Sequence, residues 1–505
     1  MKKLIARLKN RKQDQEDNKF FTLTLVLVAA ASMLLCIWIG MSQNIWFDEA
    51  YSIVTAQQPI DKIIQLSALD THPPLYYILL KAWAGIFGWS EMALRSLSVV
   101  MYGGSLVFAG LLIRKCFGPK AAVAALMFLV LSPLLMRYGF EIRMYAMASF
   151  IGILATYVMV IALEAKKNER VWLWGIYAIL VALGVYTLYY MAFLWMAHFV
   201  WLLFMTFRKK SQRNLHKAPW LYAYGVSALL FLPWLPRFGD QLHNSALAPI
   251  GQIMNIQNLL GVVSFNFLYQ PVWNLNMPLT ILLIFIIITL AVVLVRAWHM
   301  HEHREYFLLL VSYIAIPVII LMLVSFIRPM YVERYLSHVA IGLMMLVGVA
   351  VWLAEQHKPS KAVRICAGLL IVVMAVGFSS LVNYGNYNFQ RLQKPNMDAV
   401  TAELQGCKDG DAIVAADPYV AIELMANMPQ CAVHFYSDTA DLKGGYAPLA
   451  GSPLRVENPV PKFENSKVVH YVYYDEPKLQ LDKSYLADTR HSLGPVTVAT
   501  YSVKD

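Results

Sequence analysis

Charged residues are scarce in this sequence. Only 14% of its 505 residues are Asp, Glu, Lys or Arg, whereas 59% are hydrophobic. A soluble chain carries about 25% charged residues, so the composition excludes an ordinary soluble enzyme. Apolar runs of roughly 20 residues recur along most of the chain, and each is long enough to cross a bilayer as a helix. The sequence therefore predicts an all-α polytopic membrane protein.

Two further absences narrow the function. No glycine-rich phosphate-binding loop follows a strand-like run, so nothing indicates ATP or nucleotide-sugar binding. No internal repeat and no pair of broken apolar helices of the transporter kind stands out. The net charge of +11 would suggest nucleic acid in a soluble protein. Basic loops on one side of a membrane explain that charge better, and we expect no nucleic-acid partner.

The basic loops predict an orientation. The N-terminus is strongly basic, and the apolar run Phe20–Gly40 that follows is longer than a signal-peptide core of about 7–15 residues. We interpret residues 1–19 as a cytoplasmic tail and Phe20–Gly40 as the first span. Lys and Arg then cluster in alternate connections, as expected for cytoplasmic loops. Ten further apolar segments bring the expected number of spans to eleven: 91–113, 121–136, 144–163, 171–188, 190–207, 218–236, 278–295, 306–327, 335–354 and 363–382.

The segment Leu75–Phe87 is ambiguous. It is apolar but has only 13 residues, which is about 20 Å as a helix, and it contains Lys81. Counting it as a span would invert every later connection and place the basic clusters outside. We therefore expect a juxtamembrane or re-entrant helix on the outer face, with a short tilted span as the alternative.

The chain becomes polar near Asn383, which divides a membrane domain at 20–382 from a C-terminal domain at 383–505. Short strand-like runs alternate there with helix-like ones, and this predicts a small α/β domain. After an odd number of spans it lies outside the cytoplasm. Cys407 and Cys431 are its only cysteines, and oxidising conditions would allow a disulfide. Two unpaired thiols are the alternative. The expected strands are 412–415, 432–436, 468–474 and 496–503, and the expected helices are 398–404 and 419–425.

The first outer loop, residues 44–88, carries the acidic pair Asp48 and Glu49 and the turn His72-Pro73-Pro74. Carboxylates beside hydrocarbon are costly, so we interpret them as functional. Asp48 is the expected general base for an acceptor hydroxyl. Adjacent helical side chains point about 100° apart, so Glu49 faces different atoms. The alternative is structural, with Asp48 as the helix N-cap and Glu49 favoured by the helix dipole.

Two more clusters lie at the same predicted membrane surface. The first contains Arg137, Tyr138, Glu141, Arg143 and Tyr145. If its chain is helical after Gly139, Glu141 and Tyr145 share a face. The arginines are suited to binding a phosphate. The alternative is an Arg–Glu pair that closes a helix turn.

The other cluster contains Arg334 and Tyr335, next to Glu333. Aromatic belts and terminal arginines are also ordinary membrane features. The run of His299, His301 and His303 is spaced for a metal, but it falls in a predicted cytoplasmic loop. We interpret that run as a loop of mixed charge.

The runs WFDEAYS, THPPLYY, EIRMYA and ERYL resemble the GT-C superfamily of membrane glycosyltransferases. More narrowly, they resemble the branch that contains protein O-mannosyltransferases, lipid A aminoarabinose transferases and dolichyl-phosphate-mannose-mannosyltransferase-like proteins. The resemblance covers roughly residues 20–380. It implies a donor sugar on a polyprenyl phosphate and transfer with inversion of the anomeric centre.

The resemblance also implies roles for particular residues. Asp48 matches the first-loop base, Glu49 its usual neighbour and Glu141 the second outer-loop acid. His72 matches a histidine near the lipid phosphate, where Lys81, Arg137, Arg143 and Arg334 could neutralise charge. The acceptor is a lipid, a glycan or a protein, and the sequence does not choose among them. A divalent metal is compatible with the sequence but not required by it.

The expected location is the cell membrane. A transporter or flippase of lipid-linked sugars is the alternative function, and a non-catalytic sensor is a weaker one.

Overall fold

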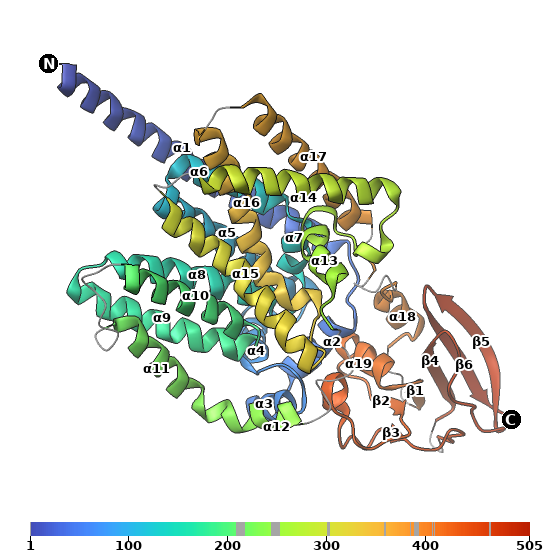
Figure 1. Cartoon of the computed structure of the whole chain (residues 1–505). Coiled ribbons are helices and arrows are strands. Elements are labelled where there is room, and N and C mark those ends of the chain that lie inside the picture. The colour runs from blue at the N-terminus through green and yellow to red at the C-terminus, as the bar shows by residue number, and fades with distance from the viewer. Residues whose placement is uncertain are drawn as a thin grey trace. The chain divides into compact units, whose positions relative to one another are not determined.

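The computed structural model describes residues 2–208, 218–243, 253–299, 303–357, 360–383, 385–387, 393–406, 408, 410–463 and 466–504. The chain divides into two compact units (Figure 1). The helical unit comprises the described parts of Met1–Gly40, Ser90–Gly239 and Ala248–Asn383. The mixed unit comprises those of Met41–Trp89, Asp240–Leu247 and Tyr384–Asp505.

Long apolar helices build the helical unit. Several begin at a residue whose side chain accepts a backbone N–H, as Ser90, Ser132 and Asn276 do. Their bounds are α1 Lys2–Met41, α5 Glu91–Phe117, α6 Pro119–Leu131, α7 Pro133–Phe140, α8 Tyr145–Glu164, α9 Lys167–Thr187, α10 Met191–Arg208, α11 Pro219–Phe231, α12 Leu235–His243, α13 Ile256–Leu268, α14 Met277–Trp298, α15 Arg304–Ile327, α16 Ser337–His357 and α17 Lys361–Asn383.

The polytopic membrane class is confirmed. Among the described residues, nine helices are long and apolar enough to cross a membrane, or up to ten if the bent pair α6–α7 is one span. Two of the eleven expected spans, 121–136 and 218–236, are irregular and do not form single long helices in the structure. Proline accounts for both irregularities, because it lacks the N–H that a continuing helix requires.

The two irregular segments lie at 121–136 and 218–236. In the first, α6 and α7 are bent by 66° at Ser132, whose ψ of 112° is the extended conformation favoured before a proline. In the second, α11 ends at Phe231 and the 3-10 turn Leu232–Trp234, which contains Pro233, follows. α11 has 13 residues.

Glycine at position 139 allows α7 to pack closely within the helical unit. A Cβ there would lie 2.9 Å from the ring of Tyr102 in α5 and 3.0 Å from the sulfur of Cys36 in α1. Such short distances would force the neighbouring atoms to move, so only glycine fits at this position without a shift. The end of α7, which leads to Glu141, is thereby fixed against α1 and α5.

The mixed unit contains a six-stranded sheet in the order β3-β2-β1-β4-β6-β5. β1 pairs in parallel with β2 and β4, whereas β6 pairs antiparallel with β4 and β5. Val414, Val469 and Tyr471 are core residues of the sheet. The strands are β1 Asp411–Ala415, β2 Val433–Tyr436, β3 Arg455–Val456, β4 Val468–Tyr474, β5 Tyr485–Leu493 and β6 Val496–Val503, and the helices are α2 Phe47–Gln57, α3 Ile60–Leu69, α4 Leu75–Phe87, α18 Met397–Glu403 and α19 Pro418–Asn427.

The predicted α/β character of the C-terminal part is confirmed, with two strands that were not predicted. β5 is exposed along seven consecutive residues, so it lacks the apolar alternation that identifies a half-buried strand. β3 has only two residues. Cys431 is disulfide-bonded, and Cys407 lies outside the described residues. Cys36, Cys116 and Cys366 are free cysteines.

The first outer loop folds with the C-terminal part of the chain. Residues 41–89 and 384–505 belong to the same compact unit, although we grouped 44–88 with the membrane domain from the sequence. α2 packs against α19, and the rings of Phe47 and Tyr419 stack with centroids 4.3 Å apart and planes inclined by 10°. The start of α2 is therefore built against α19.

Candidate active site

Asp48 lies in the first turn of α2, where the residue as a whole is half-buried. The N-cap is Trp46, which makes no side-chain capping bond, so the alternative of Asp48 as N-cap is wrong. The backbone N–H groups of Glu49 and Ala50 both donate to the Trp46 carbonyl at 2.9 Å. Ser52 Oγ donates to the backbone oxygen of Asp48 at 3.0 Å.

Glu49 has different surroundings from its neighbour. Its side chain is fully buried, with 0% of its surface exposed. This difference follows from the 100° rotation between adjacent helical residues. Of the two residues, Asp48 is the more exposed.

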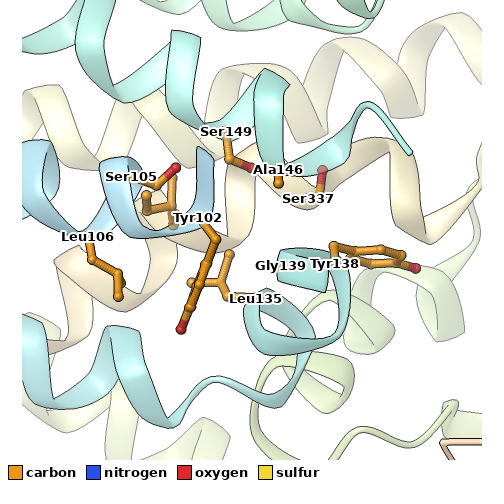
Figure 2. Close-up of a pocket in the computed structure, with 10 residues that line it drawn as sticks. Tyr102, Ser105, Leu106, Leu135, Tyr138, Gly139, Ala146, Ser149 and Ser337 are labelled. Carbon is orange, nitrogen blue, oxygen red and sulfur yellow. The ribbon is translucent and has the colours of Figure 1, made fainter. Parts of the chain in front are cut away.

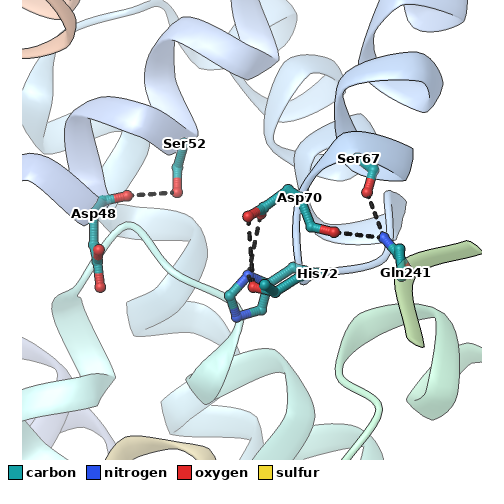
Figure 3. A network of polar contacts seen from close by, with 7 residues as sticks. Asp48, Ser52, Ser67, Asp70, His72 and Gln241 are labelled. Carbon is teal, nitrogen blue, oxygen red and sulfur yellow. Dashed lines mark hydrogen bonds and ion pairs between the residues drawn. The ribbon is translucent and has the colours of Figure 1, made fainter. Parts of the chain in front are cut away.

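His72 belongs to a compact polar network in the same unit (Figure 3). Its Nδ1 lies 3.2 Å from Asp70 Oδ2 and 2.9 Å from the Thr71 hydroxyl. A carboxylate can only accept, so the contact with Asp70 places the ring proton on Nδ1. Gln241 Nε2 donates at 2.7 Å to the carbonyl oxygens of both Ser67 and Asp70. The His-Pro-Pro turn is thus held in place through Asp70 at the end of α3, which contacts His72, and through Gln241 of α12, which binds the backbone just before the turn.

Lys81 lies in α4, the helix at the ambiguous segment Leu75–Phe87. Its Nζ donates to the carbonyl of Gln57, the last residue of α2, at 3.4 Å. A cation at a helix C-terminus is favoured by the dipole. Lys81 therefore supports α2 as well as being an expected phosphate ligand.

Tyr419 of the C-terminal part contacts the start of α2, and Tyr474 and Glu423 lie next to Tyr419. None of the three was identified from the sequence. Tyr419 stacks on Phe47, and burial together with the carboxylates of Glu423 and Asp48 raises the pKa of its phenol. Burial raises the pKa of Glu423 to about 8, and Tyr474 donates to its Oε2 at 2.7 Å. These residues lie far from Asp48 in the sequence, and no local motif indicates them.

The second predicted cluster lies in the helical unit. Arg137 Nη2 lies 3.6 Å from Glu141 Oε1, and both side chains are buried. The ion pair expected as an alternative is therefore present. Glu141 has φ −67° and ψ 136°, so the chain after α7 is extended, and the predicted shared helical face of Glu141 and Tyr145 is wrong. Ser98 Oγ donates to the Glu141 carbonyl at 2.6 Å, as does Arg143 N at 2.7 Å.

Aromatic contacts join this second cluster to the cluster of Arg334 and Tyr335. The ring of Tyr145 lies 4.9 Å from that of Tyr138 and 6.4 Å from that of Tyr335. The guanidinium of Arg334 lies 5.6 Å from the Tyr335 ring centroid, and Arg334 is buried. The helical unit therefore brings together the predicted residues of the second and third clusters.

Tyr138 and Gly139 also line a small cavity of about 10 Å³ (Figure 2). Tyr102, Ser149 and Ser337 contribute to its wall. A volume of this size accommodates about one water molecule. The cavity is too small for a sugar or a lipid, so it is not the substrate site.

The predicted residues thus fall into two groups. Asp48, Glu49, His72 and Lys81 belong to the mixed unit, whereas the arginines, tyrosines and Glu141 belong to the helical unit. Among the described residues, no group of three or more His, Cys, Asp or Glu side chains is arranged to hold a metal ion. His301 lies outside the described residues.

Comparison with known proteins identifies the fold. The family model described as dolichyl-phosphate-mannose-protein mannosyltransferase matches residues 71–236. The structure of ArnT from Cupriavidus metallidurans bound to undecaprenyl phosphate is 12% identical, with a TM-score of 0.63, over 95% of this chain and 97% of that one. The Archaeoglobus fulgidus oligosaccharyltransferase in complex with Zn and sulfate is 13% identical, with a TM-score of 0.51, over 88% of this chain and 67% of that one. No curated protein matches the sequence.

The molecule therefore has the fold of a polytopic membrane glycosyltransferase. The family-model match and the shared fold confirm the predicted resemblance to the GT-C superfamily, with an ArnT-like and protein O-mannosyltransferase-like architecture.

Proposed function

We propose that this protein is an inverting glycosyltransferase that moves a sugar from a polyprenyl-phosphate carrier to an acceptor hydroxyl, with Asp48 as general base. The observation that carries the proposal is the half-buried residue Asp48 in the first turn of α2, beside the fully buried Glu49. The fold shared with an ArnT solved with undecaprenyl phosphate supports the donor class.

The chemical step balances without a cofactor of the protein's own. Asp48 takes the proton of the acceptor hydroxyl as the oxygen attacks the anomeric carbon. The bond between that carbon and the phosphate oxygen breaks, and the lipid phosphate leaves with its electron pair. A positioned general base contributes about 10²–10⁴-fold. Attack from the side opposite the phosphate inverts the anomeric centre.

Charge on the leaving phosphate needs fixed cations. Donors positioned where charge develops are usually the largest single contribution to such a step. We assign this role to Arg334 and Arg143, and we propose that His72 lies near the same phosphate. Arg137 is held by the buried Glu141, so that carboxylate positions a cation in this scheme.

The proposal includes a location. We place the N-terminus in the cytoplasm, the protein in the cell membrane and residues 383–505 outside the cytoplasm. The basic connections that follow α5, α8 and α10 support this orientation.

Purified full-length protein tests the function directly. It is incubated with undecaprenyl phosphate carrying mannose or aminoarabinose and a total membrane-glycan extract as acceptor. We expect release of free undecaprenyl phosphate and an inverted anomeric configuration in the product. Movement of intact donor between liposome leaflets, with no release of undecaprenyl phosphate, would instead support the transporter alternative.

A further inference from the structure

Tyr269 has a backbone conformation that is unusual for a large side chain. It follows the last residue of α13, and its φ of 53° and ψ of 39° lie in the left-handed region. Glycine is the usual residue at such a helix end, because a Cβ in this conformation approaches the following carbonyl oxygen. Bulky residues keep such a conformation only where the surrounding structure fixes it, and such positions gather at functional sites. Tyrosine thus stands at a position where glycine would be less strained.

Tertiary contacts hold the end of α13 in this conformation. Ser264 Oγ donates to the carbonyl oxygen of Gln270 at 2.6 Å, and both residues are buried. The helix α17 packs so closely that a Cβ at Gly377 would overlap the carbonyl oxygen of Phe267. The backbone before and after Tyr269 is thereby fixed, and this fixes the direction in which the tyrosine side chain leaves it.

The same helix lies against the two elements that carry the predicted phosphate ligands. α13 packs against α7, where the second cluster begins (Figure 1), and against the 3-10 helix Glu333–Leu336 of the third cluster. Ser132 Oγ, at the start of α7, donates to Asn266 Oδ1 at 3.2 Å. Tyr331 Oη donates to the carbonyl oxygen of Asn258 at 3.4 Å. The end of α13 therefore belongs to the same packed region of the helical unit as both clusters.

The Tyr269 side chain takes part in the polar cluster around Tyr138. The Tyr138 phenol interacts electrostatically with Tyr269 and with three charged residues, Glu141, Glu333 and Arg334. Tyr138, Glu141 and Arg334 are buried, whereas Tyr269 and Glu333 are half-buried. Of these two more exposed residues, Tyr269 suits an anion better, because a phenol can donate a hydrogen bond and an ionised carboxylate cannot.

We propose that Tyr269 is a ligand of the donor phosphate, and that its hydroxyl donates a hydrogen bond to a phosphate oxygen of the polyprenyl phosphate beside Arg334. The inference rests on the proposed transferase function, which supplies this phosphate. A side chain that is held in its binding direction loses little conformational freedom when the ligand arrives. That preorganisation is the physical reason for a tyrosine in a strained conformation at the end of α13.

Binding of undecaprenyl phosphate to full-length protein in detergent tests the contact separately from sugar transfer. Tyr269→Phe keeps the ring but removes the hydroxyl. We expect its Kd for undecaprenyl phosphate to rise about tenfold or more, because a hydrogen bond to a charged group is lost. Its Kd for undecaprenol, which lacks the phosphate, should stay unchanged, as should its thermal midpoint without ligand.

Tyr269→Gly separates a ligand from a residue that only ends the helix. Glycine adopts the left-handed conformation without strain, so a purely structural residue could be replaced by glycine with no loss of affinity. The phosphate contact instead predicts a loss at least as large as that of Tyr269→Phe. Asp475→Gly is the matched control, because Asp475 is exposed and has a φ of 50°. It should bind undecaprenyl phosphate as the unaltered protein does.

Three results would overturn the assignment. They are an unchanged Kd for undecaprenyl phosphate in Tyr269→Phe, an equal loss of affinity for undecaprenol, and no binding of undecaprenyl phosphate by the unaltered protein. Failure of the transferase proposal has a different signature, since release of undecaprenyl phosphate from a sugar-loaded donor is measured separately. A selective loss of affinity in Tyr269→Phe, in a protein that transfers no sugar, would retain the phosphate contact and reject the transferase function.

Discussion

At the scale of single residues, the buried pair of Arg137 and Glu141 has a consequence for stability. Arg137→Met should lower the thermal midpoint, because it leaves the fully buried Glu141 without the guanidinium 3.6 Å away. Breaking one partner of a buried pair typically costs about 3–5 kcal/mol. Thermal unfolding in detergent measures the effect. The double variant Arg137→Met/Glu141→Gln should recover part of the loss, and a double variant no more stable than the single one would contradict this account.

Arg334 is expected to affect use of the lipid donor, whereas Arg137 and Glu141 affect stability. Arg334→Ala should reduce kcat/KM for the lipid donor by about 10–100-fold, because a charged hydrogen bond to phosphate contributes about 1.5–3 kcal/mol. Arg334→Lys keeps the charge but not the planar fork, so its loss should be smaller. Donor titrations with protein of equal thermal midpoint make the comparison. Unchanged kinetics in Arg334→Ala would reject our assignment of the phosphate ligand.

Glu423 should make the C-terminal part sensitive to pH. Burial raises the pKa of its carboxyl from 4.5 to about 8, although the hydroxyl of Tyr474 opposes the shift and Asp417 adds to it. The folded protein therefore binds this proton more tightly than the unfolded chain does. Its contribution to stability is complete below about pH 4.5 and is lost as the pH rises through about 8.

The prediction for Glu423 is a difference between two melting curves. Between pH 6 and pH 9 the thermal midpoint of the unaltered protein should fall more than that of Glu423→Gln, which cannot ionise. The Tyr474 contact at 2.7 Å can persist in that variant, because Gln keeps an acceptor oxygen. Parallel pH dependence in the two proteins would show that the carboxyl does not titrate in this range.

At the scale of elements, the start of α2 depends on aromatic packing. Trp46 makes no side-chain capping bond, whereas Phe47 stacks on Tyr419 and contacts Tyr446 edge-on at 5.7 Å. Tyr419→Ala should therefore shift Asp48 and lower turnover by about tenfold or more, since a displacement of about 1 Å can cost a hundredfold. Tyr419→Phe retains the stack and should keep nearly full turnover. Equal turnover by the Ala and Phe variants would reject this positioning role.

The elements also show where sequence reasoning succeeds. Regular patterns were predictable. Long apolar runs identify spans, and short runs rich in β-branched and aromatic residues identify β4 and β6, whose bounds agree with the expected 468–474 and 496–503. The breaks at Ser132 and Leu232 could have been predicted from the prolines that follow them. β5 could not, because its exposed surface carries no alternation.

The tertiary contacts of the candidate site could not be predicted from the sequence. Asp48 and His72 were identifiable from motifs in one loop. Their supports, Tyr419 and Gln241, come from distant segments, and no spacing in one sequence encodes such pairings. Asp70 lies two residues before His72, so a carboxylate partner for the His72 ring could have been predicted from the sequence.

At the scale of the whole molecule, the proposed orientation predicts which positions face the cell exterior. In a background in which Cys366 is replaced by Ser, Ala440→Cys should react with an impermeant maleimide in intact cells. Asn168→Cys, in the first turn of α9, should react only after the membrane is opened. Both positions are exposed in the structure. The opposite pattern would reverse the topology and remove Asp48 from the outer face.

The most direct test of the central claim is turnover by Asp48→Asn. Asn is nearly isosteric with Asp, and Asp48 is not the N-cap of α2, so folding should be unaffected. Asn cannot take the hydroxyl proton, so release of undecaprenyl phosphate should fall about 100-fold or more. Glu49→Gln, at the buried neighbour, is the control and should lose less turnover. Near-normal turnover by Asp48→Asn at an unchanged thermal midpoint would contradict the account.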